Sequence, residues 1–391
     1  MPVEFIGMIG TKDQSEIRNT SGPVIDRDYV RRFARAHEDA GFDRVLIGYA
    51  STQPDGAQVA AYAAAHTDRL GFLVAHRPGF VAPTLAARTF ATLDQFTGGR
   101  IAVHIITGGS DTEQRHDGDY LSKDERYART DEYLDIVKLA WTSDERFSYD
   151  GTYYKVDDFV SYVKSDQQPR IRLYFGGSSE AAYRVGGKHA DTFALWGEPL
   201  AETKQQIDAV NAAAKAAGRA DVPGISVSFR PILGPTEELA WERAHRILET
   251  TKENIAAFRA QWGTKTWPLG GDKPENVGSQ RLLAAAAKGE LHDRALWTPL
   301  AAATGAGGNS TALVGTPETV AQALLDYVDI GVTTLLIRGY DPYDDAIDYG
   351  RYVLPIVREE VAKRDAERAA AAQAESAEQA ESTESGAAVR A

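Results

Sequence analysis

The sequence predicts an α/β fold, a (β/α)8 TIM barrel, from three observations. Short apolar runs alternate with amphipathic helical stretches along most of the chain. The unit at 71–106 combines a buried-type strand, a loop, a helix, a glycine stop and a second strand. The length of 391 residues also suits one α/β barrel. A doubly wound open sheet has the same alternation and is the alternative.

Eight strands and eight helices are expected in alternation. The first helix is the clearest, because Asp26 can cap its start and Gly41 can end it. The expected strands are 3–9, 44–48, 72–74, 101–106, 172–175, 192–196, 225–233 and 333–339. The expected helices are 27–40, 56–66, 84–96, 127–142, 179–187, 200–217, 236–260 and 344–363.

The helix at 84–96 is expected to bury one apolar stripe. Gly98 and Gly99 follow it and stop it before the next strand. The residues assigned to the stripe are Leu85, Thr89, Thr92, Leu93 and Phe96.

Three segments interrupt the alternation, so the barrel is assigned to 1–363 with two insertions. Residues 145–168 predict a β-hairpin that turns at Asp150-Gly151. Residues 261–312 are long, glycine-rich and weakly periodic, which favours a mobile lid loop. Residues 364–391 are of low complexity and predict a disordered tail or a frayed helix.

Composition excludes several functions. A net charge of −13 without a basic stripe argues against nucleic acid as a partner. No apolar stretch is long enough for a membrane span, and Met1 does not open a signal peptide. Zero cysteines and eight scattered histidines argue against disulfides and metal catalysis. We expect a cytoplasmic enzyme that binds no metal.

A phosphate site is expected where Gly176, Gly177, Ser178 and Ser179 lie between a strand and a helix. Backbone N–H groups at a helix start, together with two hydroxyls, suit a phosphate monoester. A simple helix-capping turn explains the same four residues equally well. His104 and Thr107 end the fourth strand at the same barrel face, although a lone histidine there is more often a core residue.

Five strings in collinear order carry a family resemblance. They are the RPG-to-GGR segment at 77–100, DERY at 124–127, YFGGSS at 174–179, LWGEP at 195–199 and TALVG at 311–315. Over residues 3–358 the chain resembles the bacterial luciferase-like flavin monooxygenases, in particular the alkanesulfonate monooxygenase branch.

The resemblance implies FMN as cofactor. Its phosphate would lie at Gly177, Ser178 and Ser179 with Tyr127 beside it, and its ring at His104 and Thr107. The family's closest members usually have Asn at the position of His104. FMNH2 would come from a separate NAD(P)H-dependent flavin reductase, which fits the absence of a strand-linked GxGxxG. A homodimer or homotetramer is expected.

The implied reaction uses O2 to split the C–S bond of an organosulfonate into an aldehyde and sulfite. Arg230, Tyr340, Lys12 and Trp196 would surround the substrate, and Arg77 and Arg338 are further cations at strand ends. Lys12 replaces a family histidine, STQPDGA lacks the family cysteine, and Ser228 and Arg230 replace an arginine–histidine pair. The 304–310 loop lacks the family's lid arginine. The alternatives are therefore a sulfone, a sugar sulfonate or another organosulfur substrate, a reductase that uses deazaflavin or NAD(P)H, and a flavin-storage protein.

Overall fold

The computed structural model describes residues 2–18, 22–262, 274–307 and 311–388, with side chains up to residue 371. Eight parallel strands form a closed barrel, because β8 pairs with β9 as well as with β7. This confirms the predicted (β/α)8 barrel over the open sheet. The barrel strands are β1 (Glu4–Ile9), β2 (Arg44–Ile47), β3 (Gly71–His76), β4 (Ile101–Ile105), β7 (Arg172–Gly176), β8 (Thr192–Trp196), β9 (Gly224–Leu233) and β13 (Thr334–Ile337).

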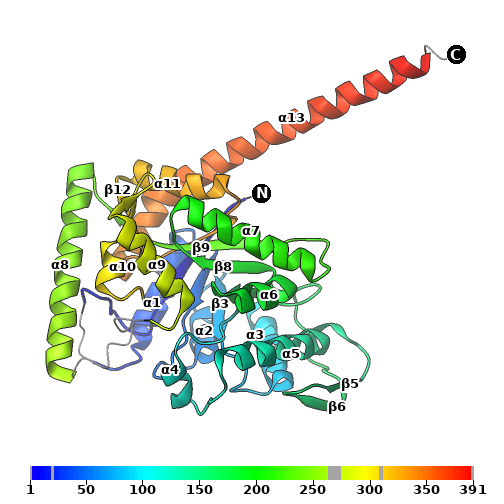
Figure 1. Ribbon diagram of the computed structural model, residues 1–391, viewed down its shortest axis with the longest axis horizontal. Helices are drawn as coiled ribbons and strands as arrows, with labels where there is room; N and C mark the ends of the chain where they lie inside the picture. The colour runs from blue at the N-terminus through cyan, green and yellow to red at the C-terminus, as the bar shows by residue number, and fades with distance from the viewer. Residues whose placement is uncertain (1, 19–21, 263–273, 308–310, 389–391) are drawn as a thin grey trace.

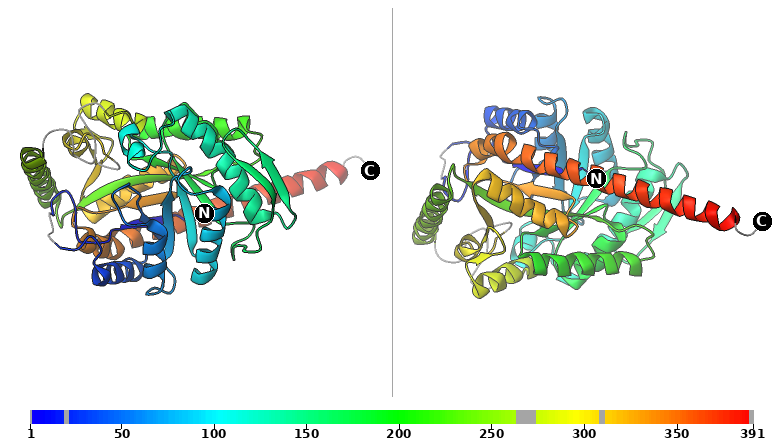
Figure 2. Two further views of the ribbon diagram at one scale, coloured as in Figure 1. Left: turned by 90° about the horizontal axis from the view of Figure 1, so that it is seen from below. Right: turned by 90° about the horizontal axis from the view of Figure 1, so that it is seen from above.

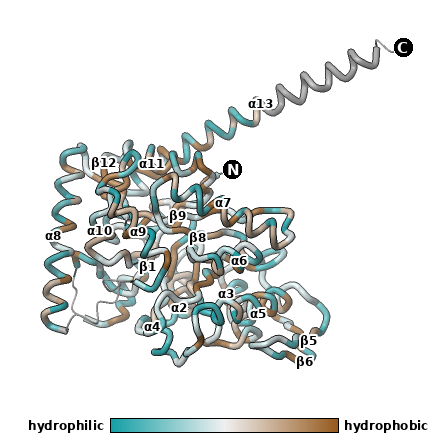
Figure 3. The backbone as a smooth tube through the Cα atoms, in the orientation of Figure 1, coloured by the Kyte–Doolittle hydropathy of each residue, from teal (hydrophilic) through white to brown (hydrophobic). Residues whose placement is uncertain are grey.

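Helices surround these strands (Figure 1), and Figure 3 shows teal and brown residues alternating along the helices. Asp26 caps the first helix by accepting a bond from Tyr29, as predicted. The outer helices are α1 (Arg27–Asp39), α2 (Gly56–Ala64), α3 (Pro83–Thr97), α5 (Lys123–Thr142), α6 (Glu180–His189), α7 (Leu200–Ala216), α8 (Glu237–Trp262), α11 (Pro317–Asp329), α12 (Pro342–Asp348) and α13 (Leu354–Ala388).

The expected stripe on α3 is wrong except at Leu93, which is buried. Leu85 is 48% exposed and Phe96 is 86% exposed, whereas the buried residues include Ala86, Ala87 and Phe90. Small side chains bring α3 close to the sheet, so the helix turns its alanine face inward and the larger Leu85 and Phe96 outward. Apolar size alone therefore misassigns the buried face.

The motif at the end of α3 builds the amino-terminal end of the barrel. Asp94 is fully buried and accepts bonds from Ile101 and from three groups in the 166–167 loop. Arg100 donates to the carbonyls of Ala64, Leu70 and Thr97. Asp94 and Arg100 tie loops together at the end opposite the site, so their role is structural.

A polar network closes the same end of the lumen. Glu4 pairs with Arg44 at 2.8 Å and accepts a 2.6 Å bond from Tyr174. The next layer toward the carboxyl ends is apolar and consists of Ile6, Leu73, Ala102, Tyr174 and Leu336. Side chains therefore fill the amino-terminal part of the barrel lumen, and only its carboxyl end can hold a ligand.

The first insertion is a two-stranded antiparallel hairpin, β5 (Phe147–Asp150) with β6 (Lys155–Phe159). The second differs from the expected loop wherever it is described. It holds α9 (Val277–Lys288), β10 (Leu291–His292), β11 (Leu296–Trp297) and α10 (Pro299–Ala303). Asn276 caps α9, and Leu282 and Ala285 bury its apolar face. Residues 263–273 and 308–310 lie outside the described residues, so the predicted mobility of the lid stays a prediction.

Beside the barrel, β9 extends past β13 and pairs in parallel with β12 (Ala312–Gly315). Figure 2 shows α9 and α10 grouped with α8 at one side of the strand bundle. The helix expected at 344–363 is interrupted by a π-helical turn at Tyr349–Val353. Beyond it the backbone of α13 stays helical to Ala388 and projects away from the barrel (Figure 1).

Among the described residues, no helix combines the length and apolarity that a membrane crossing needs.

Candidate functional site

A cavity of about 310 Å³ opens at the carboxyl end of the barrel. Three segments of the barrel and one of the second insertion contribute to it, and they are far apart in sequence. The lining includes the predicted turn residues Gly177, Ser178 and Ser179 and the predicted Tyr127. The full lining is Gly108, Gly109, Asp111, Lys123, Arg126, Tyr127, Gly177, Ser178, Ser179, Glu275, Asn276 and Val277.

The turn from β7 into α6 requires glycine. Gly177 has a φ of +150°, and a Cβ there would lie 2.6 Å from the Cβ of Ala182 and 3.0 Å from Tyr127 Oη. Ser179 is the N-cap of α6 and accepts a 3.3 Å bond from Ala182 N. The start of α6 thus presents backbone N–H groups and two hydroxyls to the cavity, which suits an oxyanion.

Two cations and two carboxylates share this cavity. Arg126 is buried and donates to the carbonyls of Thr107 and Leu121, and it also pairs with Asp111 at 2.8 Å. Lys123 lies half-buried on the same helix, and Glu275 accepts a bond from Asp111 N. Lys123 and Arg126 were missed from sequence, although Arg126 stands next to Tyr127 in the DERY string. The capping box of Ser122 and Glu125 starts α5 there and presents both cations to the cavity.

His104 lies in the lumen itself, two residues beyond Ala102 of the apolar layer. The Cβ that Gly176 lacks would come within 3.1 Å of His104 Cε1. Burial lowers the pKa of His104 to about 4, so the ring is neutral at pH 7, and its Nδ1 has no hydrogen-bond partner in the described part of the chain. Thr107 is buried beyond it, where its carbonyl accepts from Arg126. The neutral imidazole of His104, whose Nδ1 is available for a hydrogen bond, can contact an uncharged heterocycle.

These groups fit FMN. The Gly177–Ser179 turn and Lys123 match the chemistry of a phosphate, and His104 Nδ1, which has no hydrogen-bond partner among the described residues, can meet a ring edge. Bound reduced flavin would supply the electrons that activate O2.

At the other side of the mouth, Arg230 and Tyr340 are brought together. The Arg230 guanidinium carbon lies 3.6 Å from the ring centroid of Tyr340. Glu16, in the loop after β1, accepts bonds from both terminal nitrogens of Arg230 at 2.5 and 2.8 Å. Arg230 also donates to Gly339 O at 3.0 Å. Sequence gave no signal for Glu16, which lies 214 residues before its partner.

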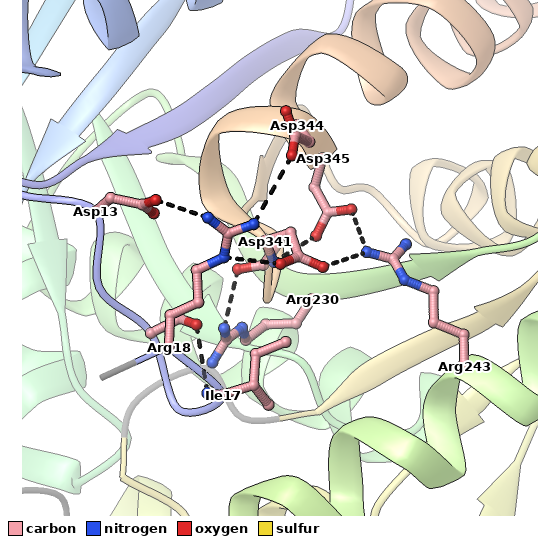
Figure 4. A network of polar contacts seen from close by, with 10 residues as sticks. Asp13, Ile17, Arg18, Arg230, Arg243, Asp341, Asp344 and Asp345 are labelled. Atoms are coloured by element: carbon pink, nitrogen blue, oxygen red, sulfur yellow. Dashed lines mark hydrogen bonds and ion pairs between the residues drawn. The ribbon is translucent and has the colours of Figure 1, made fainter. Parts of the chain in front are cut away.

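An outer ring of ion pairs holds this side in place (Figure 4). Arg18 contacts Asp13 and Asp341, and Arg243 contacts Asp341 and Asp345. The loop after β1, which carries Glu16, is thereby tied to the loop after β13.

The remaining candidates lie apart from that pair. Trp196 packs against the second insertion, where a Cβ on Gly278 would lie 2.9 Å from its ring. Lys12 is half-buried in the loop after β1 and has no partner within the described part of the chain. Arg77 is buried, pairs with Glu113 at 2.6 Å and lies 4.6 Å from the ring centroid of Tyr49.

The second insertion is tied to the barrel by a buried ion pair that sequence did not indicate. Arg281 of α9 contacts both carboxylate oxygens of Glu198, in the LWGEP string, at 2.6–3.0 Å. Glu198 is 1% exposed. This pair holds α9 beside the cavity, so that Asn276 and Val277 form one of its walls.

A closed barrel with an oxyanion cavity at the carboxyl ends of its strands defines a class of enzymes that bind phosphorylated ligands through their βα loops. Within that class, residues 4–334 match the family described as luciferase-like monooxygenases. The chain belongs to this family and is a flavin-dependent monooxygenase.

Solved structures share the fold. Riboflavin lyase RcaE, solved with modified FMN and riboflavin, is 24% identical with a TM-score of 0.76, and 92% of each chain is covered. EDTA monooxygenase EmoA from Chelativorans sp. BNC1 is 18% identical with a TM-score of 0.73, over 92% of this chain and 94% of EmoA. DmoA from Hyphomicrobium sulfonivorans is 21% identical with a TM-score of 0.73, over 92% of this chain and 89% of DmoA.

Proposed function

We propose that this protein is the oxygenase of a two-component system that uses FMNH2 from a separate NAD(P)H-dependent reductase. The observation that carries the proposal is the cavity lined by Gly177, Ser178, Ser179, Tyr127 and Lys123, with the neutral His104 farther in over the lumen. The cavity suits a phosphate, and His104, which lies beside Gly176 and is not part of the cavity lining, suits an uncharged ring.

The proposed reaction is cleavage of an organosulfonate, as in the alkanesulfonate branch. A sulfonate R–CH2–SO3H, O2 and FMNH2 give R–CHO, H2SO3, water and FMN, so the carbon beside sulfur is oxidised and one oxygen atom leaves as water. The protein's share is to bind the sulfo group, orient the carbon and exclude water.

Different residues at the carboxyl end of the barrel carry out these tasks. Trp196 and α9 cover the site, because the Trp196 ring packs against the second insertion. Arg230 and Tyr340 form a buried wall whose charge Glu16 balances, and Lys12, which has no partner among the described residues, lies on the same loop as Glu16. Covering this wall excludes water and strengthens any charge-assisted bond to the substrate.

A screen for sulfite release tests the proposal. The purified protein would receive FMNH2 from a generic flavin reductase and be offered methanesulfonate through decanesulfonate, sulfoquinovose and neutral sulfones. Release of sulfite from one of the alkanesulfonates supports the proposed organosulfonate cleavage. Turnover of a sulfone or of the sugar sulfonate supports the alternative substrates. Substrate conversion without O2 would instead support the deazaflavin- or NAD(P)H-dependent reductase.

A further inference from the structure

A second cation, Arg338, lies in the lumen beside Arg230. It follows β13 two residues beyond Leu336, which belongs to the apolar lumen layer. Its Nη1 lies 3.2 Å from the sulfur of Met8, which is itself two residues beyond Ile6 of the same layer. Arg338 and Met8 therefore form part of the floor on which a ligand in the mouth would rest, as His104 does from β4.

The hydrogen bonds of Arg230 are largely taken. Both terminal nitrogens bind Glu16, one of them also binds Gly339 O, and the guanidinium covers the Tyr340 ring. The Arg230 side chain is 3% exposed. A substrate anion would have to displace a buried carboxylate to reach Arg230, at a large cost in free energy.

Arg338, in contrast to Arg230, makes weaker hydrogen bonds and is more exposed. Its contact with Glu16 is longer, 3.2 Å, and goes to an oxygen already bound by Arg230. Its bond to Met8 has a thioether as acceptor, which is weak. The Nε of Arg338, like that of Arg230, has no hydrogen-bond partner among the described residues. The side chain is 26% exposed. Two guanidiniums thus share one carboxylate, which leaves one positive charge uncompensated in this cluster.

The pKa shifts agree with this count. Burial raises the pKa of Glu16, but Arg230 and Arg338 outweigh it and lower that pKa to about 2. Burial and then the charge of Arg230 lower the pKa of Arg338 to about 10. Arg230 and Glu16 form an ion pair. The pKa of Arg338 is lowered further by the positive charge of Arg230 beside it.

We propose that Arg338 receives the anionic group of the substrate, and that Glu16 and Arg230 form a neutralised pair beside it that takes no part in holding the anion. The site takes a sulfonate or carboxylate of a small organic molecule, which replaces the sulfur of Met8 as the hydrogen-bond acceptor. This assignment rests on the proposed function for its place in a reaction, but anion binding there can be measured without turnover.

The test is calorimetric titration of methanesulfonate into the FMN-bound protein. Arg338→Met should weaken binding at least about ten-fold, as expected for the loss of a charge-assisted bond, and Arg338→Lys should recover part of it. The exposed Arg351→Met is the matched control and should bind as the wild type does. Dimethyl sulfone, the neutral analogue, should be insensitive to all three changes.

The double variant Glu16→Gln/Arg230→Met separates Arg338 from its neighbours. It removes the pair as a unit, so Arg338 should still bind methanesulfonate within a few-fold of the wild-type affinity. Loss of binding in this variant with full binding in Arg338→Met would overturn the assignment. Should Arg338→Met not fold, Arg338→Gln takes its place with the same expected loss.

Turnover and binding can fail separately. If no sulfonate releases sulfite but Arg338→Met still loses methanesulfonate binding, the proposed reaction is wrong and the anion site stands. If sulfite is released and Arg338→Met leaves KM and kcat unchanged, the reaction stands and the anion site is wrong.

Discussion

The hydroxyl of Tyr127 stands against the bare α-carbon of Gly177, so a Cβ on that glycine would lie 3.0 Å from Tyr127 Oη and 2.6 Å from Ala182 Cβ. The β7–α6 turn and the start of α5 are thus fitted to each other around the cavity. Any side chain at residue 177 must push one of them away and so distort the turn that is proposed to hold the FMN phosphate.

Gly177→Ala should therefore weaken FMN binding by about ten-fold or more, a loss of roughly 1.4 kcal/mol. Binding of riboflavin, which lacks the phosphate, should change much less. Fluorescence titration with both flavins measures the difference. Gly218→Ala is the control, because Gly218 also has a positive φ of 78° but nothing within 4 Å of its missing Cβ. Equal losses for FMN and riboflavin would show that the turn does not hold the phosphate.

The pairing of Asp111 with Arg126 leads to a second prediction. Asp111 occupies one guanidinium nitrogen at 2.8 Å and adds negative charge to the cavity. Asp111→Asn should free Arg126 and remove repulsion, so FMN should bind several-fold more tightly, while Lys123→Gln should bind it more weakly. Both effects should shrink at high ionic strength. Unchanged FMN affinity in both variants would place the phosphate elsewhere.

His104 gives a pH dependence with a defined sign. Its pKa falls from 6.5 to about 4 on folding because burial disfavours the charged ring. Between these values the unfolded chain binds the extra proton, so this contribution to stability is present above pH 6.5 and is lost as the pH falls. The slope for one such group reaches roughly 1.4 kcal/mol per pH unit.

His104→Gln should remove that one slope. The difference in unfolding free energy between wild type and variant, measured by urea unfolding from pH 7 to pH 4.5, should shift in favour of the variant as the pH drops. His37 and His76 also have pKa values lowered to about 4 and contribute similar slopes, which the subtraction cancels. A difference that does not vary with pH would mean that folding leaves the pKa of His104 unchanged.

Substitution of Asp94 should lower the stability of the fold without weakening flavin binding. It accepts four hydrogen bonds at the amino-terminal end of the barrel, where β4 begins. Asp94→Ala leaves buried donors without a partner and should cost about 3 kcal/mol, with Asp94→Asn costing less. Thermal unfolding gives the loss, and FMN affinity measured well below the melting temperature should equal that of the wild type. A parallel drop in affinity would contradict a purely structural role.

How far the sequence predicted the molecule depends on the range of the interaction. The barrel, the Asp26 cap and the Gly177–Ser179 turn follow from local patterns, since apolar periodicity and turn chemistry involve neighbouring residues. The buried face of α3 was misjudged, because alanine packing against the sheet outweighed the size of Phe96.

The substrate side was the least predictable. Arg230 is recognisable as a cation at a strand end, but its neutralisation depends on Glu16, which only tertiary folding brings near. The same holds for Arg126, whose third partner Asp111 comes from a different helix. The charge balance of a buried cluster depends on residues that only the folded barrel brings together. Inspecting each strand of the sequence in turn therefore does not predict it.

Anaerobic titration of the purified protein with chemically reduced FMN, and in parallel with reduced riboflavin, tests the central claim most directly. The account predicts saturable binding of reduced FMN that is clearly tighter than that of reduced riboflavin, with the preference lost in Gly177→Ala. No binding of reduced FMN, or equal binding of the two reduced flavins by the wild type, would contradict it.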